Sequence, residues 1–469
     1  MTTHAGKIEM HLTTIQAILF TMTYLIEDIA HQIADGSLSA RDHIESCLAA
    51  IDDKNGQGQN TFIETYHDRA RAEADAVDTA RKNGWALPPF AGVSLSIKDL
   101  FDVAGDVTKA GSILLADSPP AKKDATIVAR LRQAGFILIG RTNMTEFAFS
   151  GLGMNVHYGN PLSPFDRATG RVSGGSSSGS AVSVSDKMAT ISIGSDTGGS
   201  TRAPASYCGI VGLKPSTARM PSDGVFPLSA SFDAAGPMGN SVACVSIIDS
   251  IMAGGTGLRE TAFTAAGLRL AIPDGYLMED LDTEVATAFD AAIDRLRDAG
   301  VHVQKIRLEA LEAMRPSNNI KSIVSAEAYR VHRQWLESDQ SEKYDPFIER
   351  RLRGGADILA ADYIDMFEKR DAVYHAIKMQ TRGFDALVLP TTPGIAPAIN
   401  DMPSIDRQIE MNARSLRNTA ISNYLDRPTI SIPCHKSGTA PVGLSLMGSR
   451  HHDRRLLAIA DGLETTIRG

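Results

Sequence analysis

Two glycine–serine turns and one lysine stand out in the sequence as groups that can carry out nucleophilic chemistry together. The first turn spans residues 174–181 (GGSSSGSA), the second spans residues 194–202 (GSDTGGSTR), and the lysine is Lys98. A serine hydroxyl is a poor nucleophile until a base removes its proton, and a lysine is such a base only when it is neutral. Burial disfavours the ammonium form and lowers the pKa of about 10.4 that a lysine has in water. Lys98 follows a strand that we expect to be buried, which suits the role of base.

The second turn also has the features of an oxyanion hole. Ser176 and Ser200 lie 24 positions apart, one in each turn, and a second serine can pass a proton between a nucleophilic serine and the lysine. The pair Gly198–Gly199 precedes Ser200, and glycines let the backbone turn sharply and point N–H groups at one spot. Such groups can bind the oxyanion of a tetrahedral intermediate, and the loss of one donor typically raises the barrier by about 2.7–4 kcal/mol. The pattern therefore predicts catalysis through an activated serine.

These segments resemble the amidase signature family. The resemblance rests on the two turns and on residues 208–215 (CGIVGLKP), and it extends from the N-terminal helix to residues 441–448. It implies a serine amidase of the Ser–cis-Ser–Lys type. Such an enzyme cleaves an amide C–N bond through an acyl-enzyme and releases a carboxylate with ammonia or an amine.

The resemblance also implies a role for each matching residue. Ser200 matches the acylated nucleophile, Ser176 matches the bridging serine that follows a cis peptide bond, and Lys98 matches the base. The positions that match the oxyanion-hole backbone are Thr197, Gly198 and Gly199. The positions that match residues supporting the motif are Asp196, Arg202 and Ser177.

The elements that must position these residues mix strands and helices without a clean repeat. Residues 91–97 alternate like a strand that ends at Lys98, and a helix around 124–134 leads into a strand at 136–139. We expect an α/β fold with one large domain, whose mixed central sheet is covered by helices on both faces. Further helices are predicted at 25–51 (interrupted at Gly36), 62–83, 178–187, 282–299, 320–337, 361–380 and 452–466. Further strands are predicted at 189–193, 209–213, 267–272, 301–306, 385–389, 428–432 and 441–447.

Length and composition fit one globular enzyme. The chain has 469 residues, of which 43% are hydrophobic and 22% charged, and its formal net charge of -8 offers no basic face for nucleic acid. We expect residues 1–22 to form a loosely held extension and residues 23–469 to form the amidase domain, with 255–380 as a candidate helical cap or insertion. Whether residues 1–21 are ordered, or Met22 is the true start, stays open.

The sequence indicates no cofactor, metal or membrane contact. The four cysteines are far apart and form no C-x-x-C pair, which favours a reduced, cytoplasmic chain. The apolar stretch at 15–25 is too short to cross a bilayer. His451 and His452 are interpreted as an exposed helix start, and we propose no metal there. The expected partner is a small-molecule amide rather than nucleic acid. The resemblance also implies that two copies of the chain form a homodimer.

Two alternative interpretations compete with this one. Residues 175–179 also satisfy G-x-S-x-G, the nucleophile elbow of α/β-hydrolases, with Ser177 as nucleophile. That interpretation needs a histidine, and none of the histidines has a distinctive setting. A non-enzymatic scaffold is the second alternative, and nothing favours it, because all three catalytic positions are filled.

The substrate is predicted only by class, as a small or aryl amide. The alternative is the glutaminase component of a tRNA-dependent amidotransferase, its A subunit, which shares the triad and requires a partner subunit. That component carries an aspartate seven residues before an asparagine; the matching asparagine here is Asn423, and the residue seven positions earlier is Leu416, which cannot pair with an ammonium group. Pocket walls are expected from 150–170, 220–232 and 320–420. Candidate wall residues, for which core packing is the alternative, are Phe149, Tyr207, Phe226 and Phe232.

Overall fold

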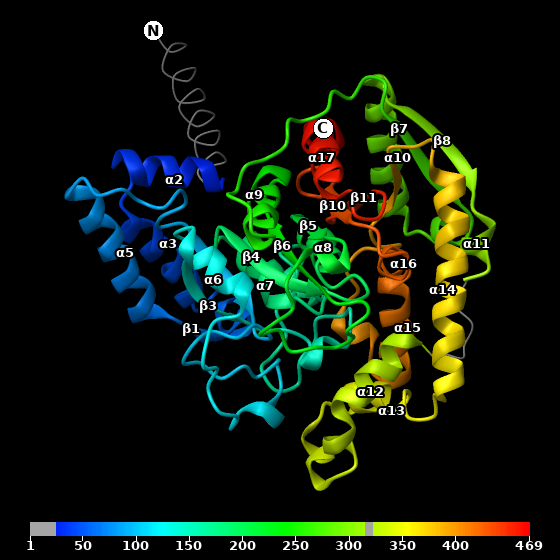
Figure 1. Ribbon diagram of the computed structural model, residues 1–469, viewed down its shortest axis with the longest axis horizontal. Helices are drawn as coiled ribbons and strands as arrows, with labels where there is room; N and C mark the ends of the chain where they lie inside the picture. The colour runs from blue at the N-terminus through cyan, green and yellow to red at the C-terminus, as the bar shows by residue number, and fades with distance from the viewer. Residues whose placement is uncertain (1–24, 315–321) are drawn as a thin grey trace.

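One mixed sheet of eleven strands runs through the part of the chain that the structure describes (Figure 1). The structure is a computed structural model, and it describes residues 25–314 and 322–469. The strand order is β1-β3-β2-β4-β6-β5-β10-β11-β9-β7-β8. The predicted α/β fold with a mixed central sheet is therefore confirmed.

Three neighbouring strands carry the glycine–serine turns and the lysine. β2 (Ser94–Lys98) lies between β3 (Ile137–Thr142) and β4 (Ile191–Asp196), and pairs with both in parallel. Every residue of these strands is buried, including the serines that alternate with apolar residues in β2 and β4. Because β2 and β4 run in the same direction, Lys98 and Asp196 end at the same edge of the sheet.

The remaining strands extend this sheet on both sides. β1 pairs antiparallel with β3, β6 joins β4 to β5, and the C-terminal half of the chain adds the other strands. Their bounds are β1 (Phe62–Thr65), β5 (Val211–Lys214), β6 (Ala234–Gly239), β7 (Arg269–Asp274), β8 (His302–Arg307), β9 (Ala386–Pro390), β10 (Thr429–Pro433) and β11 (Gly443–Met447).

Helices pack on both faces of the sheet. Met238 of β6 packs with α7 and α8 in one cluster, and a Cβ atom on its partner Gly212 would touch Ala205 of α8. Val211 and Leu213, which flank Gly212, point to the other face and pack with α9, α10 and α17. The helix bounds are α2 (Ile26–Asp35), α3 (Ala40–Asp52), α4 (Gly58–Thr61), α5 (His67–Lys82), α6 (Thr126–Gln133), α7 (Ser178–Ser185), α8 (Arg202–Cys208), α9 (Val242–Met252), α10 (Thr283–Asp298), α11 (Glu309–Glu312), α12 (Ile323–Leu336), α13 (Pro346–Arg353), α14 (Ala360–Thr381), α15 (Ile405–Leu416), α16 (Ala420–Tyr424) and α17 (Asp453–Arg468).

The predicted interruption of the stretch 25–51 at Gly36 is confirmed: two helices form there, because Gly36 takes a left-handed φ of 84° and Ser39 caps the next helix. Other predicted elements differ from the observed ones. The first four residues of the predicted helix 62–83 form β1 instead, since they pair with β3. β6 is absent from the predicted strands, because its sequence Ala-Ala-Gly-Pro-Met-Gly has little intrinsic preference for a strand.

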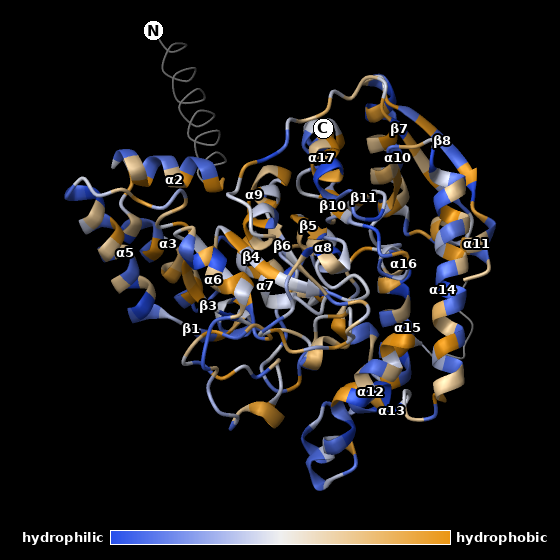
Figure 2. Ribbon diagram, in the orientation of Figure 1, coloured by the Kyte–Doolittle hydropathy of each residue, from blue (hydrophilic) through white to orange (hydrophobic). Residues whose placement is uncertain are grey.

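The stretch 255–380 contributes both to the sheet and to a layer of helices beside it. β7 and β8 continue the central sheet, and α14 lies beside this end of it, while α12 and α13 lie at the bottom of the view (Figure 1). Residues of α12 and α13 pack in the same hydrophobic cluster as residues of β2 and β3. Figure 2 shows hydrophobic residues concentrated in the central strands and mixed polarity along α14. The helical cap stays a prediction, and the predicted N-terminal extension lies outside the described residues. No helix between residues 25 and 314 or between 322 and 469 has the length and apolar character to cross a membrane.

Candidate active site

The side chains of Lys98 and Ser176 form a hydrogen bond at the end of strand β2. Lys98 is the last residue of β2, and Ser176 lies in the loop that leads into α7. The Nζ atom of Lys98 donates to the Oγ atom of Ser176 at 2.7 Å and to the Oγ atom of Ser195 at 2.9 Å. Lys98 and Ser176 are fully buried. The peptide bond between Gly175 and Ser176 is cis, as the resemblance implied.

Burial makes Lys98 a proton acceptor near neutral pH. Removal from water lowers the pKa of Lys98 to about 7, against the attraction of the carboxylates of Asp196 and Asp233, which favour the charged form. A lysine with such a pKa is substantially neutral at pH 7. It can therefore take a proton from a hydroxyl group, which an ordinary surface lysine cannot do.

Ser200 lies two positions before the start of α8 and is 4% exposed. Its carbonyl oxygen accepts a hydrogen bond from the Ser177 N–H at 3.2 Å, and the Ser177 hydroxyl donates to the Ser195 carbonyl at 3.2 Å. Ser177 thus joins the two glycine–serine turns. Within the described part of the chain, the Ser200 hydroxyl has no hydrogen-bond partner of its own.

A buried ion pair supports the turn before Ser200. Asp196 and Arg202 form a two-point contact, with Nε and Nη2 of the guanidinium at 3.0 and 2.9 Å from the two carboxylate oxygens. The same carboxylate accepts from the Thr201 N–H and from the amide of Asn423. Burial alone would raise the pKa of Asp196, but Arg202 and these hydrogen bonds hold it well below its ordinary value. The carboxylate is therefore a permanent acceptor that fixes the turn.

Two further hydrogen bonds fix the predicted oxyanion turn. The Thr197 hydroxyl donates to Asp233 at 2.5 Å, and the Gly199 N–H donates to Asp196 at 2.8 Å. Gly199 has a φ of 133°, and a Cβ atom there would lie 2.0 Å from the Oγ1 atom of Thr419. Only glycine fits this position. Because the Gly199 amide is engaged, the amides of Thr197 and Gly198 are the better candidates for binding an oxyanion.

A cavity of about 660 Å³ reaches this site from the side of β6. Ser195, which contacts Lys98, lines it together with Asp233 and the loop 217–231. Of the four predicted wall aromatics, Phe226 lines the cavity. The other three pack elsewhere: Tyr207 is 2% exposed and donates to Ser415, Phe149 lies under Arg351, and Phe232 lies under Arg370.

Sequence reasoning missed Ser195 and Asp233 as parts of the site. Ser195 stands inside the second turn, one residue before Asp196, so its position was visible but its contact with Lys98 was not. Asp233 carries no motif of its own, and burial raises its pKa to about 6. Only the pairing of β6 with β4 brings it to the Thr197 hydroxyl.

The geometry does not support the nucleophile-elbow alternative. Ser177 is fully buried, and its hydroxyl is engaged with the Ser195 carbonyl. None of the described histidines forms a hydrogen bond with Ser177. Across residues 25–314 and 322–469, no group of three or more His, Cys, Asp or Glu side chains is arranged to hold a metal ion.

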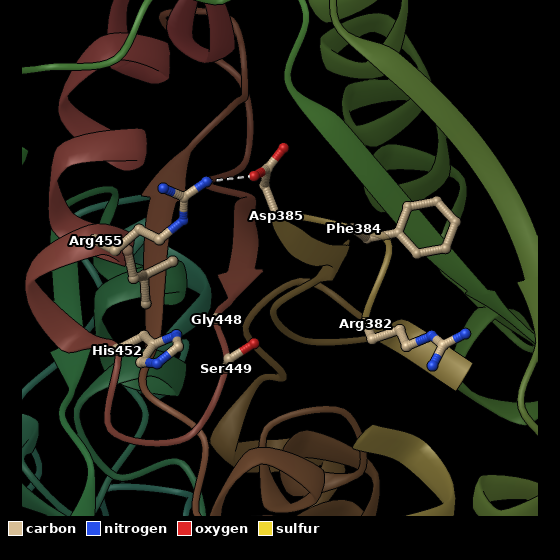
Figure 3. Close-up of a pocket in the computed structure, with 8 residues that line it drawn as sticks. Arg382, Phe384, Asp385, Gly448, Ser449, His452 and Arg455 are labelled. Atoms are coloured by element: carbon tan, nitrogen blue, oxygen red, sulfur yellow. Dashed lines mark hydrogen bonds and ion pairs between the residues drawn. The ribbon is translucent and has the colours of Figure 1, made fainter. Parts of the chain in front are cut away.

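A second, smaller cavity of about 230 Å³ lies between the end of α14, β9 and the start of α17 (Figure 3). Arg455 and Asp385 point toward each other across it and form an ion pair at 2.6 Å. Arg382 and His452 also line it. None of the predicted catalytic residues does, so this cavity is separate from the candidate active site.

Comparison with known proteins gives consistent similarities over nearly the whole chain. The family model described as Amidase matches residues 42–457. The 2-amino-5-chloromuconic acid deaminase of Comamonas testosteroni is 34% identical, over 85% of this chain and 87% of its own length. The A subunit of the glutamyl-tRNA(Gln) amidotransferase of Chloroflexus aggregans is 32% identical, over 94% of this chain and 96% of its own length. The solved structure of the peptide amidase of Stenotrophomonas maltophilia superposes with a TM-score of 0.77 at 26% identity, covering 95% of this chain and 97% of that one.

Proposed function

The chain belongs to the amidase signature family, and from this premise we propose that it hydrolyses a carboxylic amide through a serine acyl-enzyme. The observation that carries the proposal is the contact between a buried lysine of lowered pKa and a serine: Lys98 Nζ lies 2.7 Å from Ser176 Oγ. The hydrogen-bond partners of this amine are the hydroxyls of Ser176 and Ser195, so a proton can reach it through a hydroxyl group. Ser176 is the relay in this proposal, and Ser200 supplies the nucleophile at the next turn.

In the proposed reaction, the Oγ atom of Ser200 attacks the amide carbonyl carbon while its proton passes through Ser176 to Lys98. The amides of Thr197 and Gly198 bind the oxyanion that forms. Lys98 then returns the proton through Ser176 to the leaving nitrogen, the C–N bond breaks, and ammonia or an amine departs. Water attacks the resulting ester by the same proton route and releases the carboxylate.

A small or aryl amide remains the proposed substrate, and the glutaminase component of an amidotransferase remains the alternative. The alternative is favoured by the 32% identity to such a component. Against it stands Leu416, whose side chain lies beside the oxyanion turn: a Cβ atom on Gly199 would be 3.1 Å from Leu416 Cδ2. An apolar side chain there gives no partner to the ammonium group of glutamine.

Covalent labelling tests the catalytic assignment directly. A fluorophosphonate probe should label the wild-type protein at Ser200, as located by peptide mass spectrometry, and should leave Ser200→Ala unlabelled. Ser200→Ala should also lose amide hydrolysis while keeping the wild-type Tm. A label on Ser177 would instead support the nucleophile elbow.

The choice between the two substrate classes needs an activity comparison. Purified protein should release ammonia from aliphatic or aryl amides without any other protein present. Ammonia release from glutamine that appears only with the other amidotransferase subunits would favour the alternative. Action in the cytoplasm, as a homodimer and without a cofactor, stays a prediction.

A further inference from the structure

Three arginines from three separate elements line the cavity beside Lys98. Arg330 belongs to α12, Arg370 to α14, and Arg450 lies between β11 and α17. They are at least 40 positions apart in sequence, so only the fold brings them together. Asp233 and Asp426 are the carboxylates that line the same cavity among the described residues.

Both carboxylates are already satisfied by neighbours. Asp426 accepts from the Nε atom of Arg450 and from the Thr217 N–H, each at 2.8 Å. Asp233 accepts from the Thr197 hydroxyl and from two backbone amides of the loop 228–229. Neither carboxylate contacts Arg330 or Arg370 by a hydrogen bond. Among the described residues, two positive charges of the cavity therefore remain without a counter-charge at contact distance.

Arg370 is held in place by two carbonyl groups and an aromatic ring rather than by a carboxylate. Its Nε and Nη2 atoms donate to the carbonyls of Tyr424 and Asn423 at 2.7 and 3.2 Å, and its guanidinium lies 4.3 Å from the ring centroid of Phe232. It forms no ion pair with any described carboxylate, and its partial burial lowers its pKa. A half-buried, immobilised guanidinium of this kind is a ready receptor for an anion.

The rest of the cavity suits the carbon chain of a small molecule. Ser195 links it to Lys98, at 2.9 Å from the lysine nitrogen. Apolar side chains form part of the wall of the cavity. They are Leu100, Met220, Val225, Phe226 and Leu228.

Resting on the proposed function, we propose that this cavity selects amides that carry a carboxylate, such as the monoamide of a dicarboxylic acid. Arg370 is the main ligand of the carboxylate, and Arg330 at the exposed side and Arg450 beside Asp426 add to the attraction. The apolar wall accommodates the chain between the carboxylate and the amide. A neutral amide of the same shape leaves Arg370 without a counter-ion and binds more weakly.

Binding to Ser200→Ala protein tests this proposal without requiring turnover. Titration calorimetry would compare succinamate, glutaramate and adipamate with the neutral diamides of the same lengths. We expect at least one monoamide to bind roughly ten- to a hundredfold more tightly than its diamide, the range of a charge-assisted hydrogen bond. Equal affinities for all three pairs, or no binding of any monoamide, would overturn the proposal.

Arginine variants of the Ser200→Ala protein show which arginine binds the carboxylate. Arg370→Met should weaken monoamide binding roughly tenfold or more and leave diamide binding unchanged. Arg330→Met, at an exposed position, should weaken monoamide binding severalfold. Arg382→Met is the matched control, because Arg382 caps the same helix α14 outside this cavity, and it should change nothing. Equal losses in Arg370→Met and Arg382→Met would refute the subsite.

The two proposals fail in distinguishable ways. If monoamides bind but Ser200 is neither labelled nor needed for turnover, the catalytic proposal fails and the subsite stands. If Ser200 is labelled and neutral amides are hydrolysed as fast as anionic ones, only the subsite fails.

Discussion

The Nζ atom of Lys98 lies 2.7 Å from the Oγ atom of Ser176, and neither side chain is exposed to solvent. This contact joins a strand end to a loop 78 positions later in the chain. It places a group that accepts protons at neutral pH against a hydroxyl that can relay them. The behaviour of the protein in solution should therefore depend on this pair and on the groups that surround it.

The rate should depend on the protonation of Lys98. Its pKa is lowered to about 7, and only the neutral form is a base, so kcat/KM should rise as pH increases through about 7 and level off above it. A pH–rate profile between about pH 5 and 9 measures this rise. A flat profile over that range would contradict a titrating lysine base.

Replacement of Lys98 should remove the base while keeping the fold. Lys98→Met retains the apolar stem and removes the amine, so kcat should fall by about 10²–10⁴-fold with little change in Tm. Steady-state kinetics and thermal unfolding measure the two effects. Wild-type kcat in this variant would show that another group accepts the proton.

Asp233 should raise the pKa of Lys98 rather than take part in the reaction itself. Its carboxylate favours the charged form of Lys98, so Asp233→Asn should lower the pKa of Lys98. The rise of kcat/KM should then move to lower pH, while an asparagine oxygen still accepts from the Thr197 hydroxyl. The pH–rate profile of the variant checks this; a shift toward higher pH would rule out the electrostatic role.

The buried Asp196–Arg202 pair should be costly to break. Arg202→Met leaves a buried carboxylate without its partner, and the free energy of unfolding should fall by about 3–5 kcal/mol, as measured by urea denaturation. Arg307→Met, which breaks the exposed pair with Glu309, is the control and should have little effect. Similar losses of unfolding free energy in both variants would show that the buried pair contributes no more to stability than the exposed one.

Gly199 should tolerate no side chain. Gly199→Ala meets the Thr419 hydroxyl at 2.0 Å, so it should displace the oxyanion turn and reduce kcat as well as stability. Gly170→Ala is the matched control: Gly170 also has a positive φ, but nothing lies within 4 Å of its added Cβ atom. It should cost only the backbone strain of about 1–2 kcal/mol, with kcat unchanged. Equal effects on kcat would argue against the clash with Thr419.

The reacting groups are predictable from the sequence, because they lie in short motifs or at the end of a recognisable strand. Lys98 ends an alternating apolar run, and Ser176 and Ser200 stand in glycine-rich turns whose spacing is specific. Much of the mixed sheet is predictable too, since strands such as β2 and β4 carry apolar residues at alternate positions. Strand β6 cannot be predicted in this way. Its small residues have little preference for a strand, and it forms one because it pairs with β4 and β5 in the folded chain.

The groups that shape the cavity cannot be predicted from spacing. Arg330, Arg370 and Arg450 lie on separate elements and share no pattern along the chain. Arginines at such positions are usually solvated, so nothing in the sequence separates these three from the others. Phe149, Tyr207 and Phe232 show the converse. As aromatic residues near the motif they are candidate wall residues, yet none of the three lines the cavity, and Phe232 instead lies behind Arg370, which does.

The contacts of Arg202 have a consequence for biosynthesis. Its guanidinium donates to the Thr419 carbonyl, to the Ser422 hydroxyl and to the Asn423 side chain, more than 200 positions downstream. While the nascent polypeptide is still on the ribosome, the nucleophile turn therefore lacks these anchors until α16 has been translated and has left the exit tunnel. The protein therefore acquires a competent reaction centre only after residues 419–423 have emerged from the ribosome.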